Sequence, residues 1–261
     1  MKISVVTISY NQASYLDEAI QSIISQGDNL YEYIIVDPGS TDGSRDIINN
    51  YSTDISKIIF EPDEGPSDGL NKGFSYATGD IFGYINADDR LISGALKFVD
   101  DFFSNNPEID VLSGGVRIID QKGNPSFRHR TSDKFNLTNY ASGISTICQQ
   151  ATFFRRSAFE KAHGFNNKNK VSWDGELLVD MAIAGCTFTT IKKLLGDFRI
   201  YESSITGSGS YNVEIKKTHQ DICLKIKNSG IRLHPPLLKH LHKLFYKINM
   251  KRHYDYLTVK K

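Results

Sequence analysis

The sequence predicts an α/β protein in which helices cover both faces of a mainly parallel β-sheet. In the first half of the chain, short apolar runs alternate with segments of helical periodicity, which is the pattern of βαβ units. The apolar runs are continuous rather than alternating, as expected for strands that are buried on both faces. Hydrophobic residues make up 39% of the 261 residues, so the chain can fill a sizeable core.

The elements of the first half follow one another through short connections. Residues 3–8 are rich in β-branched side chains and predict the first strand. Residues 15–25 place Leu16, Ala19, Ile20 and Ile23 on one face of a helix. Further strands are predicted at residues 33–36, 57–60 and 80–85, and further helices at residues 43–51, 66–77 and 94–103.

The second half is less regular and ends in a basic segment. It predicts a strand at residues 111–119 with a bend at Gly114 and Gly115, a strand at 151–154, a helix at 174–184 and a Gly/Ser-rich loop at 203–211. Residues 212–261 hold twelve Lys or Arg and three acids, a net charge of +9, so the chain total of +1 leaves −8 for residues 1–211. We expect one domain over residues 1–211 and a basic helical extension over residues 212–261.

The cysteines and the hydropathy of the chain indicate in which cellular compartment the protein is expected. Cys148, Cys186 and Cys223 are far apart and form no Cys-x-x-Cys pair, which predicts reduced thiols rather than a disulfide framework or a zinc site. The N-terminal residues do not have the pattern of a signal peptide. No run of about 18 apolar residues predicts a membrane span. We therefore expect a cytoplasmic protein.

Polar clusters follow three of the predicted strands. In parallel α/β sheets, ligands bind beyond the carboxyl ends of the strands, so we expect the three clusters to form one site. The clusters are Ser9-Tyr10-Asn11, Asp37-Pro38-Gly39-Ser40-Thr41-Asp42-Gly43 and Asn86-Ala87-Asp88-Asp89.

Several residues, within these clusters and elsewhere in the chain, suggest particular chemistry. Asp88 and Asp89 repel each other, and a hard divalent cation such as Mg²⁺ or Mn²⁺ would relieve that repulsion; the alternative is a solvated turn. Lys72 can pair with a phosphate or simply lie on a surface helix. Asp174 opens a predicted helix, where it can act as a general base or as a cap. The loop around Gly39 can offer backbone N–H groups to an anion, or be an ordinary βα turn.

Taken together, these features resemble the inverting glycosyltransferases of family 2, which have the GT-A fold. The resemblance covers residues 1–205, and the order and spacing of the motifs make it specific. The segments that carry it are Val5-Val6-Thr7-Ile8-Ser9-Tyr10-Asn11, Ile35-Val36-Asp37-Pro38-Gly39-Ser40-Thr41-Asp42-Gly43, Asn71-Lys72-Gly73, Ala77-Thr78-Gly79-Asp80, Tyr84-Ile85-Asn86-Ala87-Asp88-Asp89, Gln150-Ala151-Thr152-Phe153-Phe154-Arg155, His163-Gly164-Phe165, Trp173-Asp174-Gly175-Glu176-Leu177 and Phe198-Arg199-Ile200-Tyr201.

The resemblance implies transfer of a sugar from a nucleoside-diphosphate sugar, expected to be a UDP-sugar, to a hydroxyl of a glycan or lipid-linked acceptor. Asp174 matches the general base of the family. Asp88, and after it Asp89, match the ligands of a Mn²⁺ or Mg²⁺ ion. The implied nucleotide-sugar site comprises Thr7, Ser9, Tyr10, Asn11, Asp37, Gly39, Asp68, Lys72, Asn86, Ala87 and Asp88, and the implied acceptor side comprises Trp173, Glu176 and Arg199.

The sequence departs from the family pattern at three positions. Asn86 stands at the first acid of the family's Asp-x-Asp motif and brings no charge to a metal. Pro38 replaces a second acid that is common after Asp37, and Tyr201 stands where many members have a histidine. We therefore expect weak affinity for the free ion until the nucleotide supplies its own oxygens.

The basic segment suggests a membrane surface or a second subunit as a partner. Apolar residues at 237, 238, 241, 244 and 245 lie near helical spacing among lysines and histidines, which fits a helix at the anionic inner face of a membrane or one packed on another subunit of a homo-oligomer. We expect no nucleic acid partner, because no binding module is present. A dinucleotide-dependent oxidoreductase would need Gly-x-Gly-x-x-Gly after the first strand. This chain has Ser9-Tyr10-Asn11-Gln12-Ala13 there, which excludes that class. A phosphatase or nucleotidyltransferase on a related fold, and a non-catalytic carbohydrate- or nucleotide-binding protein, stay open.

Overall fold

The structure, a computed structural model of the chain, describes residues 1–202, 204 and 211–233. Its strands are β1 (Ile3–Ile8), β2 (Glu32–Val36), β3 (Lys57–Ile59), β4 (Ile81–Asn86), β5 (Arg90–Leu91), β6 (Val111–Ile119), β7 (Pro125–Thr131), β8 (Thr152–Arg155) and β9 (Phe188–Arg199). Its α-helices are α1 (Ala13–Ile24), α2 (Ser44–Asn50), α3 (Pro66–Tyr76), α4 (Ala95–Asn105), α5 (Leu137–Ala141), α6 (Arg156–Lys161), α7 (Trp173–Ile183) and α9 (Asn212–Asn228), and two short 3₁₀ helices are η1 (Gly27–Asn29) and η2 (Gln149–Ala151).

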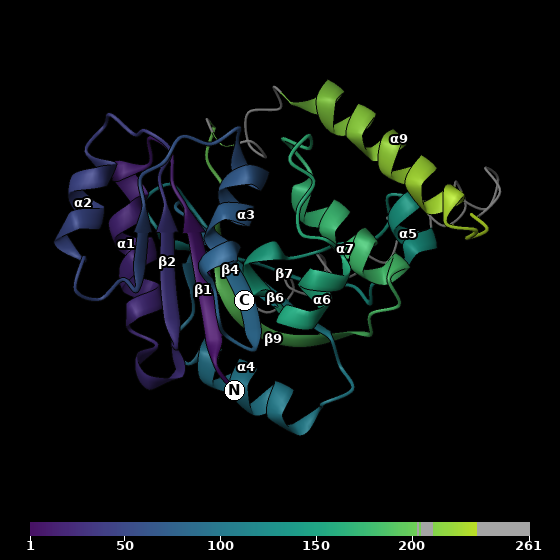
Figure 1. Cartoon of the computed structure of the whole chain (residues 1–261), viewed down its shortest axis with the longest axis horizontal. Helices are drawn as coiled ribbons and strands as arrows, with labels where there is room; N and C mark the ends of the chain where they lie inside the picture. Colours follow the sequence, from purple (N-terminus) through teal and green to yellow (C-terminus); the bar gives the residue numbers. More distant parts are fainter. Residues whose placement is uncertain (203, 205–210, 234–261) are drawn as a thin grey trace.

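All the strands belong to one sheet of order β3-β2-β1-β4-β8-β6-β9-β5, with β7 paired to β6. Helices flank this sheet on both sides (Figure 1), so the predicted α/β class is confirmed. Strands β3, β2, β1 and β4 run parallel to one another. The register places Ile8 beside both Val36 and Asn86. The three polar clusters that follow these residues therefore begin at one edge of the sheet.

The second half of the sheet is mixed. Strand β8 is antiparallel to both β4 and β6, whereas β9 runs parallel to β6. The bend predicted at Gly114 and Gly115 coincides with register shifts between β6 and β9. The sequence did not predict β9, because Lys192 and Lys193 interrupt its apolar pattern and are exposed in the structure.

Two hydrophobic clusters cover the two faces of the sheet. One contains Leu16 and Ile20 from α1 and Leu96 from α4. The other contains Leu70 from α3 and Met181 from α7. These buried side chains account for the helical periodicity of the sequence, and they fix α3 and α7 on the same side of the sheet, where both border the site described below.

Helix α9 is the described part of the basic segment. It lies against α5 and α7 (Figure 1), where Ile222 and Ile226 are buried with Leu137 and Val179. The expected amphipathic segment at residues 237–245 lies outside the described residues, and the division at residue 211 stays a prediction. Among the described helices, none has the length and apolar composition that crossing a membrane requires.

An ion-pair cluster also joins α9 to α7. The Lys225 ammonium lies 2.6 Å from Glu176 and 2.9 Å from Asp180. The Lys225 ammonium and two hydrogen-bonding asparagines hold the pKa of the Glu176 carboxyl below its usual value, although burial acts in the opposite direction and is the largest single effect. Helix α9 thus neutralises two acids in helix α7.

Replacing Lys225 with Met is expected to lower the free energy of unfolding by about 1–2 kcal/mol. The variant leaves Glu176 and Asp180 without a counter-ion, and the partial exposure of Lys225 keeps the effect moderate. Urea denaturation measures it, with Lys227→Met as the control because Lys227 is exposed on the same helix. Equal stability of the two variants would show that the ion pairs do not hold α9 in place.

Candidate functional site

A cavity of about 720 Å³ lies at the carboxyl ends of β1, β2 and β4. The residues that follow these strands and the start of α7 form much of its lining. Several site residues predicted from the sequence line it: Ser9, Tyr10, Asn86, Ala87, Asp88, Asp89, Trp173, Asp174 and Arg199. The others, which are Thr7, Asn11, Asp37, Gly39, Asp68, Lys72 and Glu176, do not.

The adjacent acids Asp88 and Asp89 have different environments. Asp89 is 2% exposed, and its two oxygens accept hydrogen bonds from the backbone N–H of Arg199 and the side chain of Gln150. Burial, and then the charge of Asp88, raise the pKa of Asp89. Asp88 is half-buried, and its Oδ2 accepts a hydrogen bond of 3.0 Å from the Tyr201 hydroxyl. Asp88 is therefore the acid better placed to meet a ligand.

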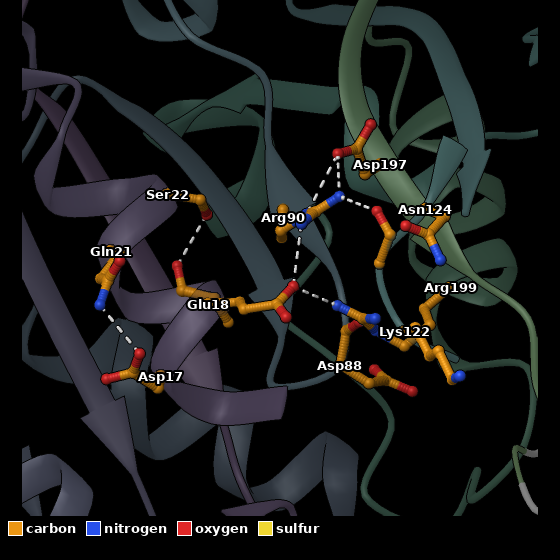
Figure 2. A network of polar contacts seen from close by, with 12 residues as sticks. Asp17, Glu18, Gln21, Ser22, Asp88, Arg90, Lys122, Asn124, Asp197 and Arg199 are labelled. Atoms are coloured by element: carbon orange, nitrogen blue, oxygen red, sulfur yellow. Dashed lines mark hydrogen bonds and ion pairs between the residues drawn. The ribbon is translucent and has the colours of Figure 1, made fainter. Parts of the chain in front are cut away.

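Arg199 is 1% exposed, and its guanidinium donates four hydrogen bonds within the protein. Figure 2 shows Glu18 between Arg90 and Arg199, with Asp88 close to Arg199. This network fixes the turn that carries Asp88. The guanidinium donates to the backbone carbonyls of Asp88, Asp120 and Gln121 and to the Glu18 carboxylate.

Tyr201 completes the surroundings of Asp88. Its ring lies 5.0 Å from that of Tyr15, and the Arg199 guanidinium lies 4.8 Å from the Tyr15 centroid. At the position where many family 2 members have a histidine, this chain thus has a phenol that donates a hydrogen bond to the acid. The phenol lowers the pKa of Asp88, but burial has the larger effect and the net shift is upward.

Asp174 lies in the first turn of α7 and faces the same cavity. Burial raises the pKa of its carboxyl, and hydrogen bonds from backbone N–H groups at the start of the helix oppose this shift only in part. In the described part of the chain, no side chain forms an ion pair or hydrogen bond with this carboxylate. A half-buried carboxylate of raised pKa and without a side-chain partner is suited to accept a proton from a ligand.

Close packing against Tyr140 explains why a glycine follows Asp174. A Cβ atom at Gly175 would lie 2.1 Å from the Tyr140 hydroxyl, so a larger residue there would displace Tyr140 or α7. The glycine lets Tyr140 pack against the turn that carries Asp174. The sequence pattern around Asp174 therefore reflects both the acid and the close approach beside it.

Two buried polar atoms in the cavity wall have no hydrogen-bond partner among the described residues. In the described part of the chain, Ser9 Oγ and Asn86 Oδ1 are buried and have no hydrogen-bond partner, and both residues line the cavity. Such atoms destabilise a protein unless a ligand or water satisfies them. The Asp88 carboxylate and the Asn86 amide oxygen together suit an oxygen-preferring divalent cation. No group of three or more His, Cys, Asp or Glu that suits a metal occurs among the described residues.

The Asp37 loop lies beside the cavity and is closed by its own hydrogen bonds. Asp37 is fully buried, and its carboxylate accepts from the backbone N–H groups of Gly39 and Ser40 and from Arg45. Asn11 has a left-handed backbone (φ 53°), and its side chain accepts from the backbone N–H of Thr41. Asp37 and Asn11 therefore shape the loop whose Pro38 lines the cavity.

The remaining predicted residues lie in hydrogen-bonded contacts outside the cavity. Thr7 is buried and accepts a hydrogen bond from the Tyr33 hydroxyl. Asp68 pairs with Lys72 at 3.3 Å, and Lys72 also donates to the carbonyl of Pro62. Glu176, predicted on the acceptor side, is 5% exposed and bound by Lys225 and two asparagines.

With this geometry in place, comparison with known proteins assigns the family. The model of the family described as "Glycosyl transferase family 2" matches residues 4–162, more than half of the chain. The chain belongs to this family. The match includes all four parallel strands and both Asp88 and Asp89, whereas Asp174 lies beyond it.

Curated relatives agree with this assignment. An uncharacterized glycosyltransferase of Nostoc sp. is 36% identical over 130 residues, which are 46% of this chain and 40% of the relative. A "PGL/p-HBAD biosynthesis glycosyltransferase" of Mycobacterium tuberculosis is 29% identical over 177 residues, 66% of each chain. The chain thus spans less than half of the first relative and about two thirds of the second.

Solved structures show the same fold at low sequence identity. A structure of S. aureus TarS 1–349 in complex with UDP-GlcNAc has a TM-score of 0.70 and 20% identity, over 89% of this chain and 68% of that chain. The mannosyltransferase PcManGT from Pyrobaculum calidifontis, in complex with GDP-Man and Mn²⁺, has a TM-score of 0.64 and 18% identity, over 99% of this chain and 70% of that chain. The GT-A architecture expected from the family is therefore confirmed.

Several residues that line the cavity were not predicted from the sequence. Asp63 lines it, and burial raises the pKa of its carboxyl. Gln149 and Gln150 come from η2, where Gln149 donates to the carbonyl of Tyr84. Arg130 comes from β7, which the turn residues Gly123, Asn124 and Pro125 signal as the second strand of a hairpin. That hairpin was the one available signal for Arg130.

Proposed function

We propose that the protein is an inverting glycosyltransferase that moves a sugar from a nucleoside-diphosphate sugar to a hydroxyl of a glycan or lipid-linked acceptor. The observation that carries the proposal is the placement of Asp174 and Asp88 in one cavity of a family 2 fold. Asp174 supplies a carboxylate of raised pKa, and Asp88 lies at the strand end where the family binds the donor diphosphate.

The nucleotide is assigned to the wall formed by the ends of β1 and β2. Tyr10 is exposed at this wall, and Ser9 Oγ has no partner among the described residues. The exposed ring can stack on a base, and the hydroxyl can bind a ribose or phosphate oxygen. TarS binds UDP-GlcNAc and PcManGT binds GDP-Man, and of these two nucleotides we propose UDP.

Asp174 is the proposed general base. The accepting hydroxyl lies between the Asp174 carboxylate and the anomeric carbon of the donor. Its oxygen attacks that carbon from the face opposite the leaving diphosphate, while Asp174 takes the proton. A single displacement of this kind inverts the anomeric configuration. Trp173, which precedes Asp174, is 9% exposed and lines the cavity beside the proposed base.

Asp88, with the amide oxygen of Asn86, would hold a Mn²⁺ or Mg²⁺ ion. Such an ion supplies positive charge that stabilises the leaving diphosphate. Asp89 has a structural role, because its two oxygens accept hydrogen bonds from Arg199 and Gln150. One carboxylate holds a free ion weakly, so ion and nucleotide are expected to bind together. The proposed location is the cytoplasm, and contact of residues 212–261 with an anionic membrane or a second subunit stays a prediction.

The test is nucleotide binding and release. Calorimetry is expected to show that UDP binds more tightly with Mn²⁺ than with EDTA, and a donor screen is expected to show metal-dependent release of UDP from one UDP-sugar. Failure to bind any nucleoside diphosphate would contradict the proposal. Binding of UDP without release from any sugar donor, across a panel of acceptors, would favour a non-catalytic binding protein.

Replacing Asp88 with Ala is expected to weaken UDP binding in Mn²⁺ by about tenfold or more. The variant removes the carboxylate that faces the cavity, so UDP should then bind equally in Mn²⁺ and in EDTA. Asp101→Ala is the control, because Asp101 is an exposed acid on α4. If Asp88→Ala kept the full difference between Mn²⁺ and EDTA, another residue would hold the ion.

A further inference from the structure

The cavity has two walls that come from opposite halves of the sheet. Ser9, Tyr10 and Pro38 line the wall at β1 and β2. Val116 on β6, Arg130 on β7 and Phe198 on β9 line the other, and β4 and β8 separate the two halves in the strand order. If the nucleotide occupies the first wall, the second is left for the acceptor.

Two arginines line the cavity, and they differ in what they contact. The guanidinium of Arg199 is buried and bound to Glu18 and to three backbone carbonyls. The guanidinium of Arg130 lies 5.9 Å from the centre of the Phe198 ring. Within the described residues, no carboxylate forms an ion pair with Arg130, and no hydrogen bond from its guanidinium is found.

Neighbouring arginines differ from Arg130 in that they form ion pairs. Arg90 and Arg117, which belong to the same part of the sheet, both pair with Asp197. Arg130 is half-buried and lines the cavity beside Phe198, which lines it as well. A planar guanidinium with five donors is suited to bind a phosphate or a carboxylate through two parallel hydrogen bonds.

The surroundings of Arg130 favour an anion on the acceptor. Strand β7 contains Arg128 and His129 and no acid, and the ring of Phe127 on the same strand is fully exposed. A basic and aromatic strand thus leads from the protein surface to the cavity. An uncharged glycan can offer the Arg130 guanidinium only neutral hydroxyl oxygens, whereas a phosphate or carboxylate accepts shorter and stronger hydrogen bonds from it.

We propose that Arg130 binds an anionic group of the acceptor, either a phosphate or a carboxylate close to the sugar that carries the accepting hydroxyl. This inference rests on the proposed function, because it takes the β1 and β2 wall as the nucleotide site. It narrows the acceptor to charged glycans or phosphate-linked polyols. Arg130 thereby determines acceptor specificity, and the donor site does not need it.

The experiment measures acceptor binding by calorimetry on the full chain, saturated with UDP and Mn²⁺. The probes are an oligo(glycerol phosphate), an oligogalacturonate and a neutral maltooligosaccharide of matched length, so that phosphate and carboxylate are distinguished. One anionic oligomer is expected to bind, and Arg130→Gln is expected to weaken it by about tenfold or more. Arg130→Lys is expected to bind with intermediate affinity, because it keeps the charge but loses the planar pair of donors.

Arg156→Gln is the matched control, because it removes one positive charge from an exposed pair with Glu160 on α6. It should change neither UDP nor oligomer affinity, and UDP affinity should also stay unchanged in both Arg130 variants. The inference is overturned if neither anionic oligomer binds, if the neutral oligomer binds as tightly, or if Arg130→Gln binds like the unmodified chain. Loss of UDP affinity in Arg130→Gln would instead place the residue on the donor side, whereas failure of the unmodified chain to bind UDP would overturn the proposed function itself.

Discussion

Replacing Asp174 with Asn is expected to reduce the rate of sugar transfer by about a thousandfold, while UDP binds as before. An amide of nearly the same shape cannot accept the proton of the attacking hydroxyl. Asp174 and Asp88 line the same cavity but lie on different elements, so the metal and nucleotide contacts are retained. The measurements are the single-turnover transfer rate and the Kd of UDP. Near-full transfer by Asp174→Asn would refute the assignment of the base.

The same variant has a pH signature and a control. Since the base must be deprotonated, the transfer rate should fall as the pH is lowered through the pKa of Asp174, which burial places above the usual range of an aspartate. The residual rate of Asp174→Asn should lack this step. Asp180→Asn, on the same helix but outside the cavity lining, should retain both the rate and the step.

The stability of Asp174→Asn is expected to move in the opposite direction to its activity. A raised pKa in the folded state means that the protonated carboxyl stabilises the fold, and that this contribution is lost as the pH rises through the folded pKa. At neutral pH the charged Asp174 is therefore unfavourable, and the neutral amide should unfold at an equal or higher temperature. A lower melting temperature would show that the negative charge of Asp174 mainly stabilises the N-terminus of α7, whose N-cap is Ser172.

The first half of the fold could be predicted from the sequence because its signals are local. Runs such as Ile3–Ile8 are apolar throughout, and the helices between them keep a strict periodicity. Strand β9 has no such pattern: its first part is partly exposed, and only the part near Leu195 is buried. It belongs to the sheet because β6 pairs with it along almost its whole length, and that is information from distant residues.

The candidate site, too, could be predicted only in part from the sequence. Because strands end at Ile8, Val36 and Asn86, the sequence could predict which loops meet. It could not predict how each polar atom is used. The oxygens of Asp37 are occupied by its own loop. Arg130 lines the cavity because the pairing of β7 with β6 brings it there.

Replacing Arg199 with Met is expected to lower the free energy of unfolding by about 3 kcal/mol or more. Met keeps much of the side-chain volume but leaves the backbone carbonyls of Asp88, Asp120 and Gln121 without their donors. Arg199 is 1% exposed, so water cannot readily replace the lost hydrogen bonds. Chemical denaturation measures the loss, and Arg156→Met, which removes an exposed arginine, should change stability by less than about 0.5 kcal/mol.

The Arg199 variant also separates support of the site from contact with a ligand. If Arg199 acts by holding the turn that carries Asp88, then Arg199→Met should weaken metal-dependent UDP binding in proportion to its loss of stability, and stabilising osmolytes should restore part of both. If it binds the acceptor, as its place in the sequence motif suggested, stability should be nearly unchanged and only transfer should fall. The first result is favoured, because the Arg199 guanidinium already donates four hydrogen bonds within the protein and is 1% exposed, which leaves little of it for a substrate.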